Sequence, residues 1–392
     1  MDKLRDRHLN SRFARLPLEQ YQLPAGWAES VCTPALVVRL HQVRKNLKSV
    51  LVRLDGCADR WRPHVKTVKI PSALALFSEI GVRQFKAATA REARVLFETL
   101  AKSDAGAIDL LVAYPICGPS GTLLARLLDE FPENRISVLC ESAAAAAELD
   151  PRIGLYIDLN PGMQRTGVPE TDWERLGGLI DHLGSRFRGL HFYDGHIHGD
   201  DAAGRRQMAH AGYDRLMGWI ESRSWLEPFE LVTSGTPAFL YALDYRPFVA
   251  STQFQHRVSP GTVSYHDLRT EELLEDLDLV PAATLLSRVV SHPSATRVTC
   301  DAGSKSIAAE AGDPCAFVVG HPDWIAATPS EEHLPLDIAS GELPPRGELI
   351  ELIPRHVCPT VNLAEEAIIV DGETLSVERV AARAHDLWLE PR

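Results

Sequence analysis

Short apolar runs alternate with amphipathic helical patterns from Thr33 to about residue 275 of the chain. Runs rich in β-branched residues predict strands, whereas apolar residues spaced three and four apart predict helices. After a first run at Ala35–Leu40, the expected strands are Trp61–Val65, Gln84–Ala88, Leu110–Ala113, Arg135–Leu139, Ile153–Asp158, Gly189–Tyr193, Glu230–Thr233 and Ser251–Val258. The helical patterns between them include Ser72–Ile80, Ala90–Leu100, Gly121–Glu130, Ser142–Leu149 and Asp172–Leu183. Strands that alternate with helices of this size imply a parallel sheet.

The number of strands favours a closed barrel. Eight expected strands follow the run at Ala35–Leu40, which is the number needed for a (β/α)8 barrel. The alternative is an open doubly wound sheet, but no GxGxxG or GxxxxGK loop follows any of these strands. Beyond about residue 275, short strand-like runs are separated by turns that contain Pro and Gly. We therefore predict an α/β fold with an N-terminal arm (1–32), a TIM-type (β/α)8 barrel (33–272) and a second, mostly β C-terminal domain (273–392).

The composition and charge exclude some classes of partner. With 45% hydrophobic and 24% charged residues, the 392-residue chain has an ordinary globular composition. Its net charge of −12 argues against general binding to nucleic acid or anionic membranes, but it is compatible with a local pocket for one phosphate. The seven cysteines are odd in number and lack CxxC spacing, which favours a reducing cytoplasmic location. We find neither a signal-peptide pattern nor an apolar stretch long enough to span a bilayer.

Polar residues collect where the expected barrel strands end. The runs that follow the first, fifth, sixth, seventh and eighth strands are Arg62–Lys69, Asp158–Gly167, His191–His198, Thr233–Pro237 and Ser259–Thr262. The carboxyl ends of barrel strands form the active-site face, so we expect these runs to lie together. A lysine on this face can be desolvated, which favours imine formation, whereas a KxxK pair taken alone is more often two solvated loop lysines. Loops of Gly, Ser and Thr after strands seven and eight are a common phosphate-binding place.

The run Arg355-His-Val-Cys-Pro-Thr-Val-Asn362 indicates a metal site in the β domain. On a strand, His356 and Cys358 would point to the same face and could share one metal ion. Taken alone, such a pattern is more often a buried histidine and an inert cysteine. A thiolate is a soft ligand, so Cys358 favours zinc over manganese or magnesium.

Several of these motifs resemble one family. RPHVKTVK resembles the RPHxKTHK block of the D-threonine aldolase and D-serine dehydratase family, which comprises fold-type III pyridoxal-phosphate enzymes built like alanine racemase. The GMQRTG, HVCPTVN and DAGSK runs resemble further blocks of that family, and the resemblance extends from Thr33 to Asn362. Val68 and Val263 depart from the usual histidine and tyrosine, which concerns substrate specificity more than cofactor binding. Asp301–Lys305 has a second interpretation, as a tight turn with a surface ion pair.

The resemblance implies roles for individual residues. It implies that Lys66 is the internal Schiff-base lysine, that Arg165 faces the pyridine nitrogen, and that His356 and Cys358 are the two protein ligands of a metal ion. The further cofactor contacts that it implies are Tyr193, Ser234, Gly235, Thr236, Gly261 and Thr262. It also implies a homodimer that acts on a small D-amino acid.

The implied reaction is that of a lyase on D-3-hydroxy amino acids such as D-serine, D-threonine or 3-hydroxy-D-aspartate. If Lys66 removes the α-proton, water is lost and a 2-oxo acid with ammonia results. If His196 or His198 removes the hydroxyl proton, retro-aldol cleavage gives glycine and an aldehyde. The alternatives are a racemase of the same fold and a non-catalytic pyridoxal-phosphate carrier. The chain has no tyrosine after Tyr265 to act as the racemase base, and carriers lack the β domain.

Overall fold

The computed structural model describes residues 11–24, 26–103, 106–197, 201–223, 228–274, 277–339 and 341–387. The chain forms two compact units. The barrel unit comprises Val50–Lys66, Leu74–Gly261 and Ala384–Arg392, and the β unit comprises Met1–Ser49, Thr67–Ala73 and Thr262–Arg383. The two units thus alternate along the sequence, and the division into 1–32, 33–272 and 273–392 stays a prediction.

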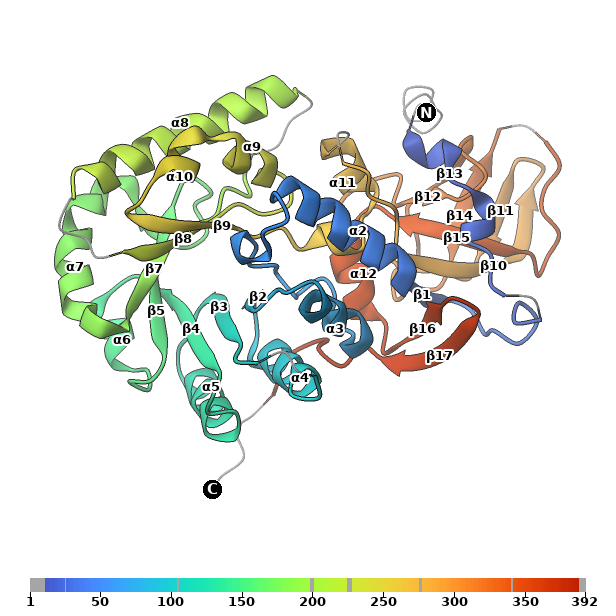
Figure 1. Ribbon diagram of the computed structural model, residues 1–392. Helices are drawn as coiled ribbons and strands as arrows, with labels where there is room; N and C mark the ends of the chain where they lie inside the picture. The colour runs from blue at the N-terminus through green and yellow to red at the C-terminus, as the bar shows by residue number, and fades with distance from the viewer. Residues whose placement is uncertain are drawn as a thin grey trace. The chain divides into compact units, whose positions relative to one another are not determined.

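Parallel strands form the centre of the barrel unit (Figure 1). Neighbouring strands pair in the order β2 (Gln84–Ala87), β3 (Asp109–Pro115), β4 (Arg135–Cys140), β5 (Gly154–Asn160), β7 (Phe187–Phe192), β8 (Phe229–Thr233) and β9 (Phe254–Val258). The short β6 (Val168–Pro169) pairs with β5 outside this path. The expected first strand is not a regular one, but Trp61 bridges to Val258 of β9 and His64 bridges to Lys86 of β2. This segment occupies the eighth strand position, and the predicted (β/α)8-type α/β fold is confirmed.

Helices connect the barrel strands and pack apolar faces onto them. They are α3 (Pro71–Glu79), α4 (Ala90–Leu100), α5 (Pro119–Glu130), α6 (Ala143–Ala147), α7 (Leu176–Leu183), α8 (Ala202–Glu221), α9 (Phe239–Asp244) and α10 (Arg246–Ala250). Helix α4 shows why such segments are helical. The Thr89 hydroxyl caps its first turn by accepting from Glu92 N, and its apolar side chains at three- and four-residue spacing are buried.

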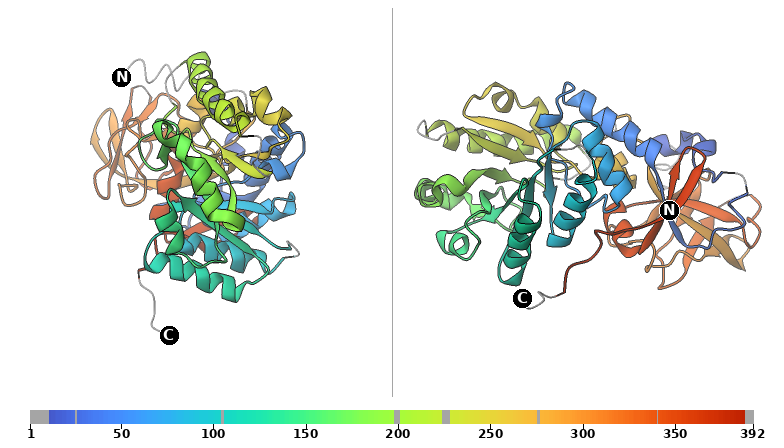
Figure 2. Two further views of the ribbon diagram at one scale, coloured as in Figure 1. Left: turned by 90° about the vertical axis from the view of Figure 1, so that its left-hand side faces the viewer. Right: turned by 60° about the horizontal axis from the view of Figure 1, so that its bottom comes forward.

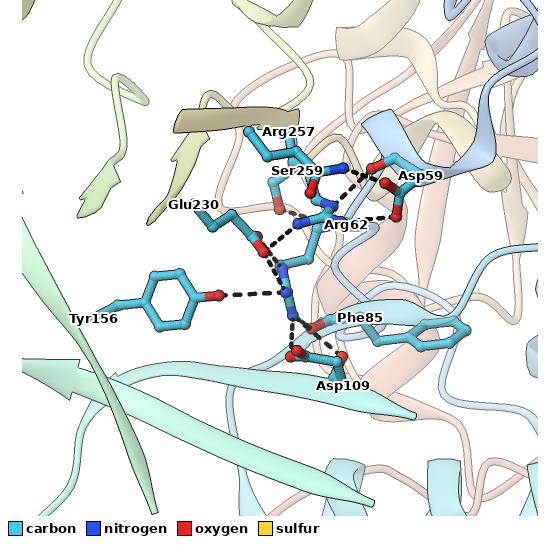
Figure 3. Close-up of polar contacts among 9 residues, drawn as sticks. Asp59, Arg62, Phe85, Asp109, Tyr156, Glu230, Arg257 and Ser259 are labelled. Carbon is cyan, nitrogen blue, oxygen red and sulfur yellow. Dashed lines mark hydrogen bonds and ion pairs between the residues drawn. The ribbon is translucent and has the colours of Figure 1, made fainter. Parts of the chain in front are cut away.

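The barrel interior contains a network of buried charges centred on Arg62 (Figure 3). The fully buried Arg62 guanidinium donates to Glu230 at 2.6 and 2.8 Å and to Asp109 Oδ1 at 3.0 Å. Glu230 also accepts from Arg257, which pairs with Asp59 at 2.7 Å. Burial would lower the pKa of Arg62, but the surrounding acidic groups raise it well above its ordinary value. The network fixes the segment that leads to Lys66.

The β unit contains a nine-stranded, mostly antiparallel sheet (Figure 2). The main path runs through β13 (Trp324–Ala326), β14 (Leu334–Ile338), β11 (Arg297–Cys300), β10 (Ala283–Ser294), β1 (Ala35–Arg39), β16 (Glu366–Asp371) and β17 (Thr374–Arg379), while β15 (Leu349–Pro354) joins β10 and β12 (Ala316–Val318). The run at Ala35 is therefore a strand of this sheet, where β1 pairs antiparallel with β10 and parallel with β16. The helices that belong wholly or partly to this unit are α2 (Leu40–Arg53), α3 with its first residues, α11 (Leu268–Leu273) and α12 (Val357–Leu363).

The described part of the N-terminal arm is packed within the β unit. Two short 3-10 helices, Arg12–Arg15 and Leu18–Gln20, follow one another there. Phe13 is 2% exposed and clusters with Leu268 and Phe317. No helix in the described residues combines the length and apolarity that a membrane span needs.

Candidate active site

Lys66 lies directly after the segment that completes the barrel. Its side chain is exposed, and its backbone N–H is 3.4 Å from His64 Nδ1. Within the described ranges, the Lys66 ammonium makes neither a hydrogen bond nor an ion pair. Since all strands of the barrel are parallel, Lys66 lies at the same end as the loops that follow β5, β7, β8 and β9.

Tyr193, after β7, brings two cations together at this end of the barrel. The Arg165 Cζ is 4.9 Å from the centroid of the Tyr193 ring, and the Lys86 Nζ is 5.5 Å from it. Two glycines leave room for the ring, because a Cβ added at Gly195 or at Gly235 would lie 2.3 or 2.7 Å from it. Real side chains cannot approach so closely, so both positions require glycine. The structure thus brings the sequence-predicted Arg165, Tyr193 and Gly235 together.

Two buried carboxylates, Asp158 and Asp194, belong to the same strands and loops as these residues. Asp158 on β5 is 2.7 Å from His191 Nδ1 on β7, and burial lowers the pKa of His191 although Asp158 opposes the shift. The hydroxyl of Tyr213 donates to Asp194 at 2.5 Å, and that of Ser234 donates to it at 3.3 Å. Burial raises the pKa of Asp194 to about 6 despite these hydrogen bonds.

Sequence reasoning missed Lys86, Asp194 and Tyr213 as members of this group. Lys86 lies within β2 and is 2% exposed. Its pKa is lowered to about 7, chiefly by burial and next by the nearby charge of Lys66. A lysine in an otherwise apolar strand segment is the only sequence signal that could have marked it.

The predicted phosphate loops follow β8 and β9. Ser234 has a left-handed backbone conformation (φ 61°) and a buried hydroxyl, and Thr236 is also buried. At Gly261, an added Cβ would lie 2.4 Å from the backbone oxygen of His64, so only glycine fits this close approach. The next residue, Thr262, belongs to the β unit.

Of the two histidines predicted as the base, the structure describes His196 and not His198. His196 is half-buried, and its Nε2 lies 3.4 Å from where a Cβ at Gly162 would stand. His198 lies outside the described residues, so its proposed role stays a prediction.

The predicted metal ligands meet at the start of a helix, so their placement on a strand was wrong. Strand β15 ends at Pro354, and His356 is the N-cap of α12. The chain turns there because Asp267 accepts from Val357 N at 2.9 Å and Thr360 donates to the His356 carbonyl at 2.9 Å.

The side chains of His356 and Cys358 nevertheless interact. Burial alone would lower the pKa of His356, but Cys358, Asp267 and Glu310 together raise it to about 9. The hydroxyl of Thr67 lies 3.1 Å from Cys358 Sγ, and that of Thr262 lies 3.4 Å from it. Among the described residues, no group of three or more His, Cys, Asp or Glu could hold one metal ion together. His356 and Cys358 would thus supply one nitrogen and one sulfur ligand.

The Asp301–Lys305 run forms a turn with structural contacts. Asp301 accepts from Thr33 at 2.6 Å and from Ser287 at 2.7 Å, which ties three segments of the β unit together. Lys305 is exposed and pairs with Glu332 at 2.7 Å. These contacts match the interpretation as a tight turn with a surface ion pair.

The residues at the barrel end fit the cofactor that the resemblance implies. Within the described residues, Asp158 Oδ2 and Asp194 Oδ1 are buried without a hydrogen-bond partner. Buried polar atoms are nearly always paired, so this region suits a polar ligand. Three cations, Lys66, Lys86 and Arg165, are close enough to act on one another electrostatically, which suits an anion such as pyridoxal phosphate. The imidazole and thiol of the β unit fit zinc, which favours nitrogen and sulfur ligands.

Comparisons with known proteins agree with this description. The family model for the N-terminal domain of alanine racemase matches residues 38–268, and that for a putative serine dehydratase domain matches 282–370. A D-threonine aldolase of Arthrobacter sp is 27% identical over 375 residues, covering 90% of this chain and 93% of that protein. The D-threonine aldolase structure from Filomicrobium marinum has a TM-score of 0.79 and 24% identity, covering 92% of this chain and 98% of that one. D-threo-3-hydroxyaspartate dehydratase from Delftia sp. has a TM-score of 0.70 and 19% identity, covering 93% and 100%.

Proposed function

The chain belongs to the family defined by the N-terminal domain of alanine racemase, in the group of D-threonine aldolase and D-serine dehydratase, and on that premise we propose that it is a pyridoxal-phosphate-dependent lyase of D-3-hydroxy amino acids. One observation supports this most strongly. Lys66, whose ammonium has no hydrogen-bond or ion-pair partner among the described residues, shares the carboxyl end of a parallel barrel with Arg165, Tyr193 and glycine-bearing loops. This is the set of groups that an imine-forming phosphate cofactor needs.

Each of these residues would hold a different part of the cofactor. The Lys66 amine would bind its aldehyde covalently, and Arg165 would donate to its ring nitrogen. Hydroxyls and backbone N–H groups of Ser234, Gly235, Thr236, Gly261 and Thr262 would bind the phosphate. When bound, pyridoxal phosphate supplies an electron sink for the electron pair left at the substrate Cα.

The metal ligands belong to the same proposal. His356 and Cys358 would hold a divalent ion, with zinc favoured because thiolate is a soft ligand. Such an ion supplies a Lewis acid for the β-hydroxyl of the substrate. With two protein ligands, the remaining coordination positions would be open to water or substrate.

Two outcomes of the reaction are each favoured by a specific observation. The full-length match to a D-threonine aldolase favours cleavage to glycine and an aldehyde, with His196 or His198 taking the hydroxyl proton. The cysteine in the metal-binding pair favours dehydration, with Lys66 taking the α-proton and the hydroxyl leaving as water. In both, the amino acid has D configuration and a hydroxyl at Cβ.

The test starts with covalent mapping. We expect borohydride reduction of the pyridoxal-phosphate-loaded protein to place the pyridoxyl group on the peptide that contains Lys66. Lys66→Ala should lose the imine absorbance, whereas the exposed Lys102→Ala should keep it. An imine that persists in Lys66→Ala would contradict the cofactor assignment.

Product analysis then separates the reactions. With zinc or manganese, D-threonine should give either glycine and acetaldehyde or 2-oxobutyrate, and L-threonine should give neither. Absence of both product sets under every metal condition would favour the carrier alternative. Interconversion of D- and L-alanine would favour the racemase alternative. We also propose a homodimer, which light scattering of the loaded protein tests.

A further inference from the structure

We propose that Lys86 is a second active-site lysine at the carboxyl end of the barrel, which gives a proton to the substrate Cα after Cα–Cβ cleavage and takes it back in the reverse direction. The inference rests on the proposed function and adds a residue to it.

Lys86 lies inside the barrel rather than on its surface. Both polar groups of its backbone bond to one neighbouring segment: Lys86 N donates to Pro63 O at 2.9 Å, and Val65 N donates to Lys86 O at 2.8 Å. Strand β2 is thereby joined to the segment that leads to Lys66. The Lys86 side chain reaches the ring of Tyr193, on which Arg165 also lies.

Apart from the Tyr193 ring, the Lys86 amine has no partner among the described residues that would compensate for its burial. Among the described residues, the two buried lysines are Lys69 and Lys86. Lys69 donates to the Ala382 carbonyl at 3.2 Å, so its burial is compensated. The Lys86 amine makes no hydrogen bond or ion pair within the part of the chain that the structure describes. An unpaired buried ammonium is costly, so a residue of this kind is a candidate for a functional role.

Burial, more than the surrounding charges, brings the pKa of the Lys86 amine close to neutral pH. Lys66 and Arg165 disfavour the ammonium form, whereas Asp158 and Asp194 favour it, and His191 also faces this group. Burial is the largest effect, and the net result is a Lys86 pKa lowered to about 7. A proton carrier works best when its pKa lies close to the working pH.

In cleavage, the base takes the hydroxyl proton, the Cα–Cβ pair stays on Cα and the aldehyde leaves. The Lys86 ammonium then gives its proton to Cα, and glycine departs after its release from the cofactor. Water then gives a proton to the Lys86 amine. The base in turn passes its proton to the resulting hydroxide, so that both groups return to their starting states. No oxidant or reductant is needed.

The first measurement uses no turnover. Trace acetylation with acetic anhydride, followed by mass spectrometry, gives the pH at which the Lys86 amine becomes reactive. We expect a midpoint near pH 7, against 10.5 for an ordinary lysine, and protection when pyridoxal phosphate is bound. Exposed Lys102 serves as the unprotected reference. A midpoint at the ordinary lysine value, or no protection in a protein that binds the cofactor, would overturn the inference.

The second measurement follows the exchange of glycine α-hydrogens in deuterium oxide, which reports proton transfer at Cα whichever lyase reaction occurs. Lys86→Met should slow exchange by about 10²- to 10⁴-fold, the usual contribution of an acid–base group, while the imine absorbance at Lys66 is retained. Lys86→Arg keeps the charge but cannot give up its proton, so it should not restore exchange. Exchange restored by arginine would assign a purely electrostatic role and overturn the proposal. A wild-type protein that binds no pyridoxal phosphate would instead overturn the proposed function, and the inference with it.

Discussion

Replacing Glu230 with Gln should destabilise the barrel unit by about 3 kcal/mol. Glu230 accepts from Arg62 at 2.6 and 2.8 Å and also from Arg257, and the three side chains are 9%, 0% and 8% exposed. Glutamine has nearly the same size as glutamate. The substitution therefore removes only the negative charge between the buried guanidinium groups of Arg62 and Arg257. Removing one partner of a buried ion pair usually costs about 3–5 kcal/mol. Asp109 and Asp59 still compensate in part, so we expect the lower end of that range.

Urea unfolding followed by tryptophan fluorescence measures this change, because the indole of Trp61 lies in the segment that Arg62 anchors. The matched control is Asp129→Asn, which removes one of the two acidic partners of Arg152, in a pair whose side chains are 48% and 49% exposed. An exposed pair contributes about 0–1 kcal/mol, so the control should change little. If Glu230→Gln costs no more than Asp129→Asn, the network does not stabilise the barrel and the reasoning fails.

Three more predictions concern the site. Gly235→Ala should weaken pyridoxal-phosphate binding at least about tenfold in a fluorescence titration, because the added Cβ would lie 2.7 Å from Tyr193; unchanged affinity would contradict the assigned loop. Burial raises the Asp194 pKa from 3.8 to about 6, so ionising it in the folded protein should reduce stability as the pH rises from about 4 to 6. Asp194→Asn should abolish that decrease in urea unfolding, and an unchanged profile would refute the assignment. Cys358→Ser should lower the bound zinc measured by mass spectrometry, whereas Cys57→Ser, at an exposed position, should not; equal zinc content would refute the ligand role.

The barrel could be predicted because its strands are apolar runs of regular length, and the chemistry at their ends followed from parallel topology. The predicted metal ligands, His356 and Cys358, were placed on the wrong element. A carboxylate distant in sequence, Asp267, accepts from Val357 N and helps the chain to begin α12 there. No local pattern in HVCPTVN contains that contact. Lys86 was missed for the same reason, because its burial arises only when β2 joins the other strands.

The two ends of the barrel interior differ in whether their buried polar groups have hydrogen-bond partners. This difference separates structural from functional groups. Around Arg62, the buried guanidinium meets carboxylates, a carbonyl and the Tyr156 hydroxyl, so the network is complete without a ligand. At the other end, the Lys86 amine, Asp158 Oδ2 and Asp194 Oδ1 have no hydrogen-bond partner within the described residues. Leaving a buried polar group unpaired costs about 1–3 kcal/mol, more for a charge. Stability alone does not favour such groups, so their presence together argues that a bound molecule completes them during function.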